Sequence, residues 1–168
     1  MKAFKFYFIV LLLLIVSSVG FTQRLTKNAE ISLLTCSPGT QELYSHFGHS
    51  ALRIVDTTTQ TDVVYNYGVF DFDTPNFYWK FIKGKLRYQL ALHHTYSFLQ
   101  VYASEGREVK EEKLLLTESE KGKLLQFLQW NYQPENRYYL YDFFYKNCSS
   151  IIWEVVKSQL NTAVTFDT

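Results

Sequence analysis

Short runs that contain apolar, β-branched and aromatic residues, separated by turn and loop residues, occupy the middle of this chain and predict β-strands. These runs cover residues 30–35, 50–55, 62–67, 85–92 and 107–116. In the run at 85–92, Leu86, Tyr88, Leu90 and Leu92 alternate with mostly polar neighbours, which is the pattern of a strand that buries one face and exposes the other. A polar stretch at 56–61 separates the second run from the third, which indicates a hairpin. The third run is predicted to end at Gly68.

Other segments carry apolar residues at helical spacing, three and four positions apart. Helices are predicted over 40–47, 75–83, 96–104, 117–133 and 148–160. The helix at 117 has the clearest start signal, because Thr117 and Glu120 form a capping box just before an apolar stripe. That stripe consists of Leu124, Leu125, Phe127 and Leu128. The mixture of strands and helices predicts an α+β domain with an antiparallel sheet packed against helices.

The N-terminus has the pattern of a secretory signal peptide. Lys2 and Lys5 precede an apolar run of 11 residues at 6–16, and small residues follow at 17–20. A membrane-spanning helix needs about 20 apolar residues, so this run is short for one. We expect residues 1–22 to be the signal peptide and 23–168 to be one exported domain. An uncleaved anchor that holds the domain at the membrane is the alternative.

The composition limits the class of partner. Lys and Arg number 17 against 16 Asp and Glu, and no basic stripe suggests a nucleic-acid binder. No group of residues has the spacing of a metal site, and we expect no cofactor. Aromatic residues are abundant, with 14 Phe, 13 Tyr and 3 Trp. They indicate a well-filled core or a surface suited to a membrane interface.

Two residues far apart in the chain carry the candidate chemistry. Cys148 begins the last predicted helix, where unpaired N–H groups and the helix dipole favour a thiolate. His49 lies at the mouth of the predicted strand at 50–55, next to Gly48. A thiol becomes a nucleophile when an imidazole takes its proton, so the pair is typical of a cysteine–histidine enzyme. His46, three residues earlier, is the alternative base.

A third group is expected to orient the imidazole. Asn66 and Tyr65 lie on the neighbouring predicted strand, and their side chains point to opposite faces, so only one of them can serve. Asn66 is the preferred candidate. A structural alternative also stands, because an exported protein with two cysteines can bridge Cys36 to Cys148.

Several motifs in a fixed order resemble a known family. They are Cys36-Ser37-Pro38-Gly39, Phe47-Gly48-His49-Ser50-Ala51-Leu52-Arg53, Val64-Tyr65-Asn66-Tyr67-Gly68, the run at 70–77, and Asp142-Phe143-Phe144-Tyr145-Lys146-Asn147-Cys148. Together they resemble the N-terminal periplasmic domain of the lipoprotein N-acyltransferases of Bacteroidetes. The resemblance covers residues 30–160. It implies a circularly permuted papain-like fold of the NlpC type, with the cysteine-bearing helix near the C-terminus.

The resemblance also implies a reaction and its partners. Cys148, assisted by His49, would take an acyl chain from a phospholipid as a thioester and pass it to a lipoprotein N-terminal amine. The domain would then work in the periplasm or at the periplasmic face of the inner membrane. Members of the family continue into membrane-spanning helices, so three alternatives stand for this chain: a fragment of a longer protein, a product truncated before such a region, or a free-standing relative. A cell-wall peptidase, an amidase or a thioesterase on the same fold is the alternative, as is a disulfide-bonded module without activity.

Overall fold

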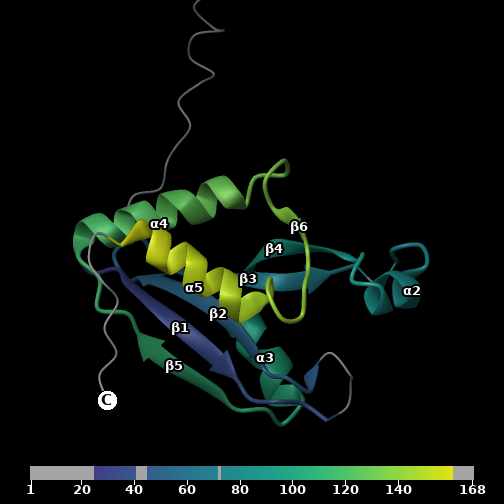
Figure 1. Ribbon diagram of the computed structural model, residues 1–168. Coiled ribbons are helices and arrows are strands. Elements are labelled where there is room, and N and C mark those ends of the chain that lie inside the picture. The colour runs from purple at the N-terminus through teal and green to yellow at the C-terminus, as the bar shows by residue number, and fades with distance from the viewer. Residues whose placement is uncertain (1–24, 41–44, 72, 161–168) are drawn as a thin grey trace, which may run out of the picture.

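The computed structural model describes residues 25–40, 45–71 and 73–160 (Figure 1). The elements are β1 (Glu30–Cys36), β2 (His49–Asp56), β3 (Thr61–Phe70), α2 (Phe77–Ile82), β4 (Arg87–His94), α3 (Thr95–Ser104), β5 (Val109–Lys113), α4 (Glu118–Asn131), β6 (Tyr138–Leu140) and α5 (Cys148–Gln159). The predicted signal peptide at 1–22 lies outside the described residues, as does half of the predicted helix at 40–47.

The strands form one sheet in the order β5-β1-β2-β3-β4-β6, and every neighbouring pair is antiparallel. The prediction of an α+β domain with an antiparallel sheet is therefore confirmed. Helices α4 and α5 pack on one face, while α3 packs on the other (Figure 1). The central strands β2 and β3 are thus covered on both sides, which holds their ends in a fixed position.

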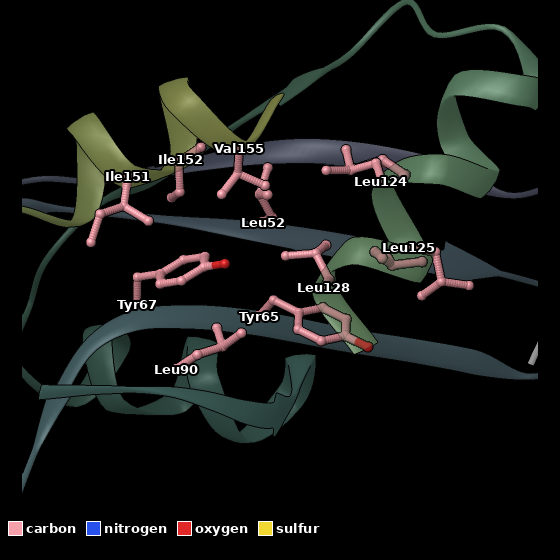
Figure 2. Close-up of a cluster of buried hydrophobic side chains, with 12 residues drawn as sticks. Leu52, Tyr65, Tyr67, Leu90, Leu124, Leu125, Leu128, Ile151, Ile152 and Val155 are labelled. Atoms are coloured by element: carbon pink, nitrogen blue, oxygen red, sulfur yellow. The ribbon is translucent and has the colours of Figure 1, made fainter. Parts of the chain in front are cut away.

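The larger core lies between the sheet and helices α4 and α5. Leu124, Leu125 and Leu128 of α4 meet Ile151, Ile152 and Val155 of α5 above the side chains of the sheet (Figure 2). Each large apolar side chain buried in this way contributes about 1.5–3 kcal/mol to folding. The stripe predicted from sequence is therefore the buried face of α4, although Phe127 is only partly buried.

The capping box of α4 forms as predicted. The Thr117 hydroxyl accepts from the Glu120 N–H at 3.3 Å, and the Glu120 carboxylate accepts from the Thr117 N–H at 3.0 Å. Two N–H groups at the helix start are thereby paired. This fixes where α4 begins relative to the sheet.

Three predicted boundaries were wrong. Strand β3 does not end at Gly68 but continues to Phe70. Gly68, with φ +92°, lies in a bulge between Asn66 and Val69, and the strand resumes after it. Strand β5 is shorter than the predicted run at 107–116, and β4 runs from 87 to 94 in place of 85–92. Strand β6 lies in the aromatic-dense segment before Cys148, where no strand was predicted.

Among the described residues, no helix is both long enough and apolar enough to cross a membrane.

Candidate active site

Helix α5 places Cys148 at its first residue. The preceding residue, Asn147, is the N-cap: its side chain accepts from the Ser150 N–H at 3.0 Å. The Ser150 hydroxyl in turn accepts from the Asn147 N–H at 2.9 Å. These reciprocal bonds fix the start of the helix. The N–H groups of Cys148 and Ser149, the first two residues of the helix, have no acceptor within the helix and remain for a developing negative charge.

Strand β2 begins with His49, directly after a tight turn. Gly48 has φ +73°, and a Cβ there would lie 2.7 Å from the carbonyl oxygen of Cys36. Only glycine fits this position without displacing backbone, so the turn sets the direction in which the imidazole leaves the strand. The alternative base, His46, is exposed and is not among the residues that line the cavity beside Cys148.

The His49 ring contacts Asn66 on β3. The distance from His49 Nε2 to Asn66 Oδ1 is 2.6 Å. Because an amide oxygen only accepts, Nε2 carries the proton of this bond, and Nδ1 remains for the thiol. Tyr65 points to the opposite face and is buried in the core between the sheet and the helices. The structure thus brings Cys148, His49 and Asn66 together and leaves Tyr65 elsewhere.

The environment of Cys148 favours the thiolate. Burial raises the pKa of this thiol, but the hydrogen bond and positive charge of His49 lower it. The Ser50 backbone N–H and the Ser149 hydroxyl act in the same direction, and together these groups bring the pKa to about 7. A substantial fraction is therefore ionised at neutral pH, which is a property of nucleophilic cysteines.

Cys36 has the opposite character. It is buried at the end of β1, and burial raises the pKa of its thiol to about 11. Both cysteines are free thiols in the structure, so the predicted alternative of a Cys36–Cys148 bridge is not formed. A buried neutral thiol of this kind behaves as a small apolar side chain.

The β3 bulge brings Gly68 next to the reactive groups. A Cβ at Gly68 would lie 3.5 Å from His49 Cε1 and 3.8 Å from Cys148 Cβ. The absence of a side chain leaves the surface between imidazole and thiol open on that side. The positive φ of 92° also favours glycine here. The sequence signal for this feature was the glycine at the end of the third run, which was interpreted as the end of the strand.

A cavity of about 880 Å³ opens beside the thiol and the imidazole. This volume lies within the range of small-molecule sites, about 300–1,000 Å³. Cys148, His49 and Asn66 line it together with an apolar wall of Phe70, Phe81, Leu86, Tyr88 and Tyr141. The cavity is therefore lined by reactive groups and by aromatic surface.

Sequence reasoning missed the pair Tyr88 and Tyr141. Their rings stack at a centroid distance of 4.3 Å on the cavity wall. Burial, and to a lesser degree the charge of Cys148, raises the pKa of Tyr141 to about 12, so its hydroxyl stays protonated. The density of aromatic residues just before Cys148 was the available signal, but it did not indicate which rings face the thiol.

Other polar groups are used in the sheet. Arg53 pairs with Asp62 and Glu111, each at 2.8 Å. It does not line the cavity. Within the described part of the chain, no three His, Cys, Asp or Glu side chains gather where they could hold a metal ion.

Residues 22–168 match the family model of the Lnb N-terminal periplasmic domain. The chain belongs to this family. Cys148, His49 and Asn66 all lie within the matched residues of the Lnb N-terminal periplasmic domain. The match agrees with the family suggested by the sequence motifs, and it makes this chain a periplasmic domain. No curated protein and no solved structure matches the chain.

Proposed function

We propose that this domain is a cysteine acyltransferase of the cell envelope, with Cys148 as its nucleophile. It moves an acyl chain from a phospholipid to the N-terminal amine of a lipoprotein. The observation that carries the proposal is a thiol with a pKa of about 7, next to a His49–Asn66 pair, in the wall of an aromatic cavity. In the chain, the strand that begins with His49 precedes the helix that begins with Cys148. On this proposal, that order is the one found in a permuted papain-like enzyme.

The first half of the reaction forms a thioester. The Cys148 thiolate attacks the carbonyl carbon of a phospholipid ester, and the oxygen becomes an oxyanion. On this proposal, the N–H groups of Cys148 and Ser149 at the start of α5 stabilise this charge. The intermediate then collapses: the carbon–oxygen bond to glycerol breaks, and the leaving oxygen takes a proton from His49. A lysophospholipid departs and the acyl chain remains on sulfur.

The second half transfers the chain to nitrogen. The free amine of the lipoprotein attacks the thioester carbonyl, and His49 accepts the proton that the nitrogen loses. The carbon–sulfur bond breaks, and Cys148 leaves as a thiolate. A thiol with a low pKa is a good leaving group, so this step returns the enzyme to its starting state. Asn66 keeps the imidazole oriented in both halves.

The cavity supports an acyl chain as the transferred group. Phe70, Phe81 and Leu86 provide apolar surface next to the reactive sulfur. Burial of methylene groups against such surface contributes about 0.8 kcal/mol each, which favours a long chain over a short one.

The proposed reaction is tested by comparing products. The protein is incubated with phospholipid and a synthetic diacylglyceryl-cysteine peptide, and the peptide is analysed by mass spectrometry. A peptide heavier by one acyl chain, together with lysophospholipid, supports the acyltransferase. Release of free fatty acid without peptide modification would assign a thioesterase or lipase reaction instead. Cleavage of peptidoglycan fragments without lipid transfer would assign a peptidase or amidase.

Replacing Asn66 with alanine is expected to lower acyl transfer by about 10²-fold, because the imidazole loses the partner that orients it. Tyr65→Phe is the matched control, since Tyr65 is on the neighbouring residue but faces the core. Its activity should stay close to that of the unmodified protein. Initial rates of peptide acylation measure both variants. A larger loss in Tyr65→Phe than in Asn66→Ala would reverse the assignment.

A further inference from the structure

The mouth of the cavity carries apolar side chains that nothing in the described structure covers. The rim of this mouth consists of helix α2, the loop at 142–146 and Phe47. All three parts contribute residues to the cavity lining. Ile82 of α2 is 75% exposed and Phe144 of the loop is 80% exposed. Exposed apolar patches next to a binding cavity mark a surface that meets a partner.

Helix α2 is the first part of the rim. Five of its six residues are aromatic or aliphatic, and none of them is buried. It projects beyond the end of the sheet, away from α4 (Figure 1). Phe77 packs on Phe70 of β3, with ring centroids 5.4 Å apart, and this contact connects the helix to the sheet. Tyr78 and Trp79 remain exposed, so the helix presents aromatic surface to its surroundings.

The loop at 142–146 is the second part, and it is braced. The Asp142 carboxylate accepts from the N–H groups of Phe144 and Tyr145, both at 2.9 Å. The Asn147 side chain donates to the Phe143 carbonyl at 2.9 Å. Phe47 packs edge-on against Phe143 at 4.3 Å, so the rim is continuous on this side of the cavity. The fold thus holds exposed aromatic side chains in place.

The charges around α2 complement an anionic surface. The segment at 71–87 holds four cationic residues and two carboxylates, namely Lys80, Lys83, Lys85, Arg87, Asp71 and Asp73. Lys83 lies over the Trp79 ring with its Nζ 4.1 Å from the centroid. Trp and Tyr beside Lys and Arg are typical of segments that lie at the interface between lipid headgroups and acyl chains.

We infer that the rim docks on a phospholipid bilayer, with α2 and the loop at 142–146 entering the headgroup region. The inference rests on the proposed function, because a bilayer supplies the acyl donor directly at the cavity mouth. A second copy packed rim against rim would place the cations of one α2 segment against those of the other. The bilayer satisfies both the apolar side chains and the excess of positive charge.

The three tryptophans provide the test. Trp79 lies on the rim and is 61% exposed, whereas Trp130 of α4 and Trp153 of α5 are 56% and 42% exposed and do not line the cavity. Three single-tryptophan forms of the full chain are made by changing the other two residues to phenylalanine. Fluorescence is then measured with vesicles of phosphatidylethanolamine and phosphatidylglycerol that contain brominated lipid as the quencher.

We expect bromine to quench the Trp79-only form several-fold more strongly than the other two. All three forms share the same N-terminal segment, so any anchoring by that segment is equal among them. Ile82→Ser with Phe144→Ser in the Trp79-only form should reduce quenching and weaken vesicle binding by about tenfold or more, as the loss of two apolar anchors predicts. Tyr96→Ser with Leu115→Ser removes two apolar residues of similar exposure outside the rim. This control should change neither the quenching nor the vesicle binding.

Equal quenching of the three tryptophans, or stronger quenching of Trp130 or Trp153, would overturn the docking inference. So would a rim-dependent dimer without quenching, which would assign the rim to a second copy. The proposed reaction can fail while docking is confirmed. If Trp79 is quenched but no acyl transfer occurs, the docking inference holds and the proposed reaction does not. Acyl transfer in detergent without Trp79 quenching would remove the docking inference alone. Circular dichroism confirms that each variant is folded.

Discussion

Changing Cys148 to alanine is expected to abolish acyl transfer while the domain stays folded. The proposed thioester cannot form without the sulfur, and loss of a nucleophile that works with a base lowers turnover by about 10⁴-fold or more. Cys148 is only partly buried, at the first position of α5. The bonds that cap this helix are made by Asn147 and Ser150 and do not involve the Cys148 side chain. The free energy of unfolding should therefore change by no more than about 1 kcal/mol.

Cys36→Ala is the matched control for this change. It makes the same chemical change, the loss of one thiol, at a site where that thiol is buried and neutral. We expect it to retain acyl transfer and to lose about 1 kcal/mol of stability, because it leaves a small cavity in the core. Peptide acylation and urea unfolding measure the two effects. An inactive Cys36→Ala, or an unfolded Cys148→Ala, would indicate that the sulfurs have structural roles.

Changing His49 to alanine is expected to move the ionisation of Cys148 to higher pH. In the native site the pKa of the thiol is about 7, and the lowering contributions begin with the hydrogen bond and charge of His49. Without them, burial dominates, and the pKa should rise above the ordinary cysteine value of about 8.5. The thiolate fraction at pH 7 then falls from about half to about 3% or less.

The rate of alkylation by iodoacetamide, measured against pH, reports this ionisation. It is followed in a Cys36→Ala background, so that Cys148 is the one thiol in the protein. We expect a midpoint near pH 7 with His49 present and above pH 8.5 without it. His46→Ala is the control and should leave the midpoint near 7, because His46 is exposed and does not line the cavity. An unchanged midpoint in His49→Ala would mean that His49 does not assist the thiol.

The sequence was informative where a local pattern determines the structure. Apolar runs bounded by turn residues located strands β1 to β4, and the capping box located the start of α4. The prediction that Cys148 begins a helix also depended on local signals, since an asparagine cap precedes it and an apolar stripe follows at Ile151, Ile152 and Val155. These features involve residues within a few positions of one another, so a single sequence contains them.

What the sequence did not determine depends on contacts between distant segments. The bulge at Gly68 arises from pairing between β3 and β4. Residues 138–140 form strand β6 because they pair with the edge of β4. The cavity wall joins Tyr88 to Tyr141, which are far apart in the chain. Strand alternation indicated that only one of Asn66 and Tyr65 could be the partner of His49, but which of them it is, and the 2.6 Å contact with Asn66, required the fold.

The central claim is that the fold makes Cys148 a nucleophile that carries an acyl chain. The most direct measurement is peptide mapping by mass spectrometry after incubation with phospholipid and without an amine acceptor. We predict one acyl chain on the peptide that contains Cys148, removed by hydroxylamine at neutral pH and absent in His49→Ala. A Cys148 that stays unmodified while acyl transfer proceeds, or an acyl chain found on another residue, would contradict the account.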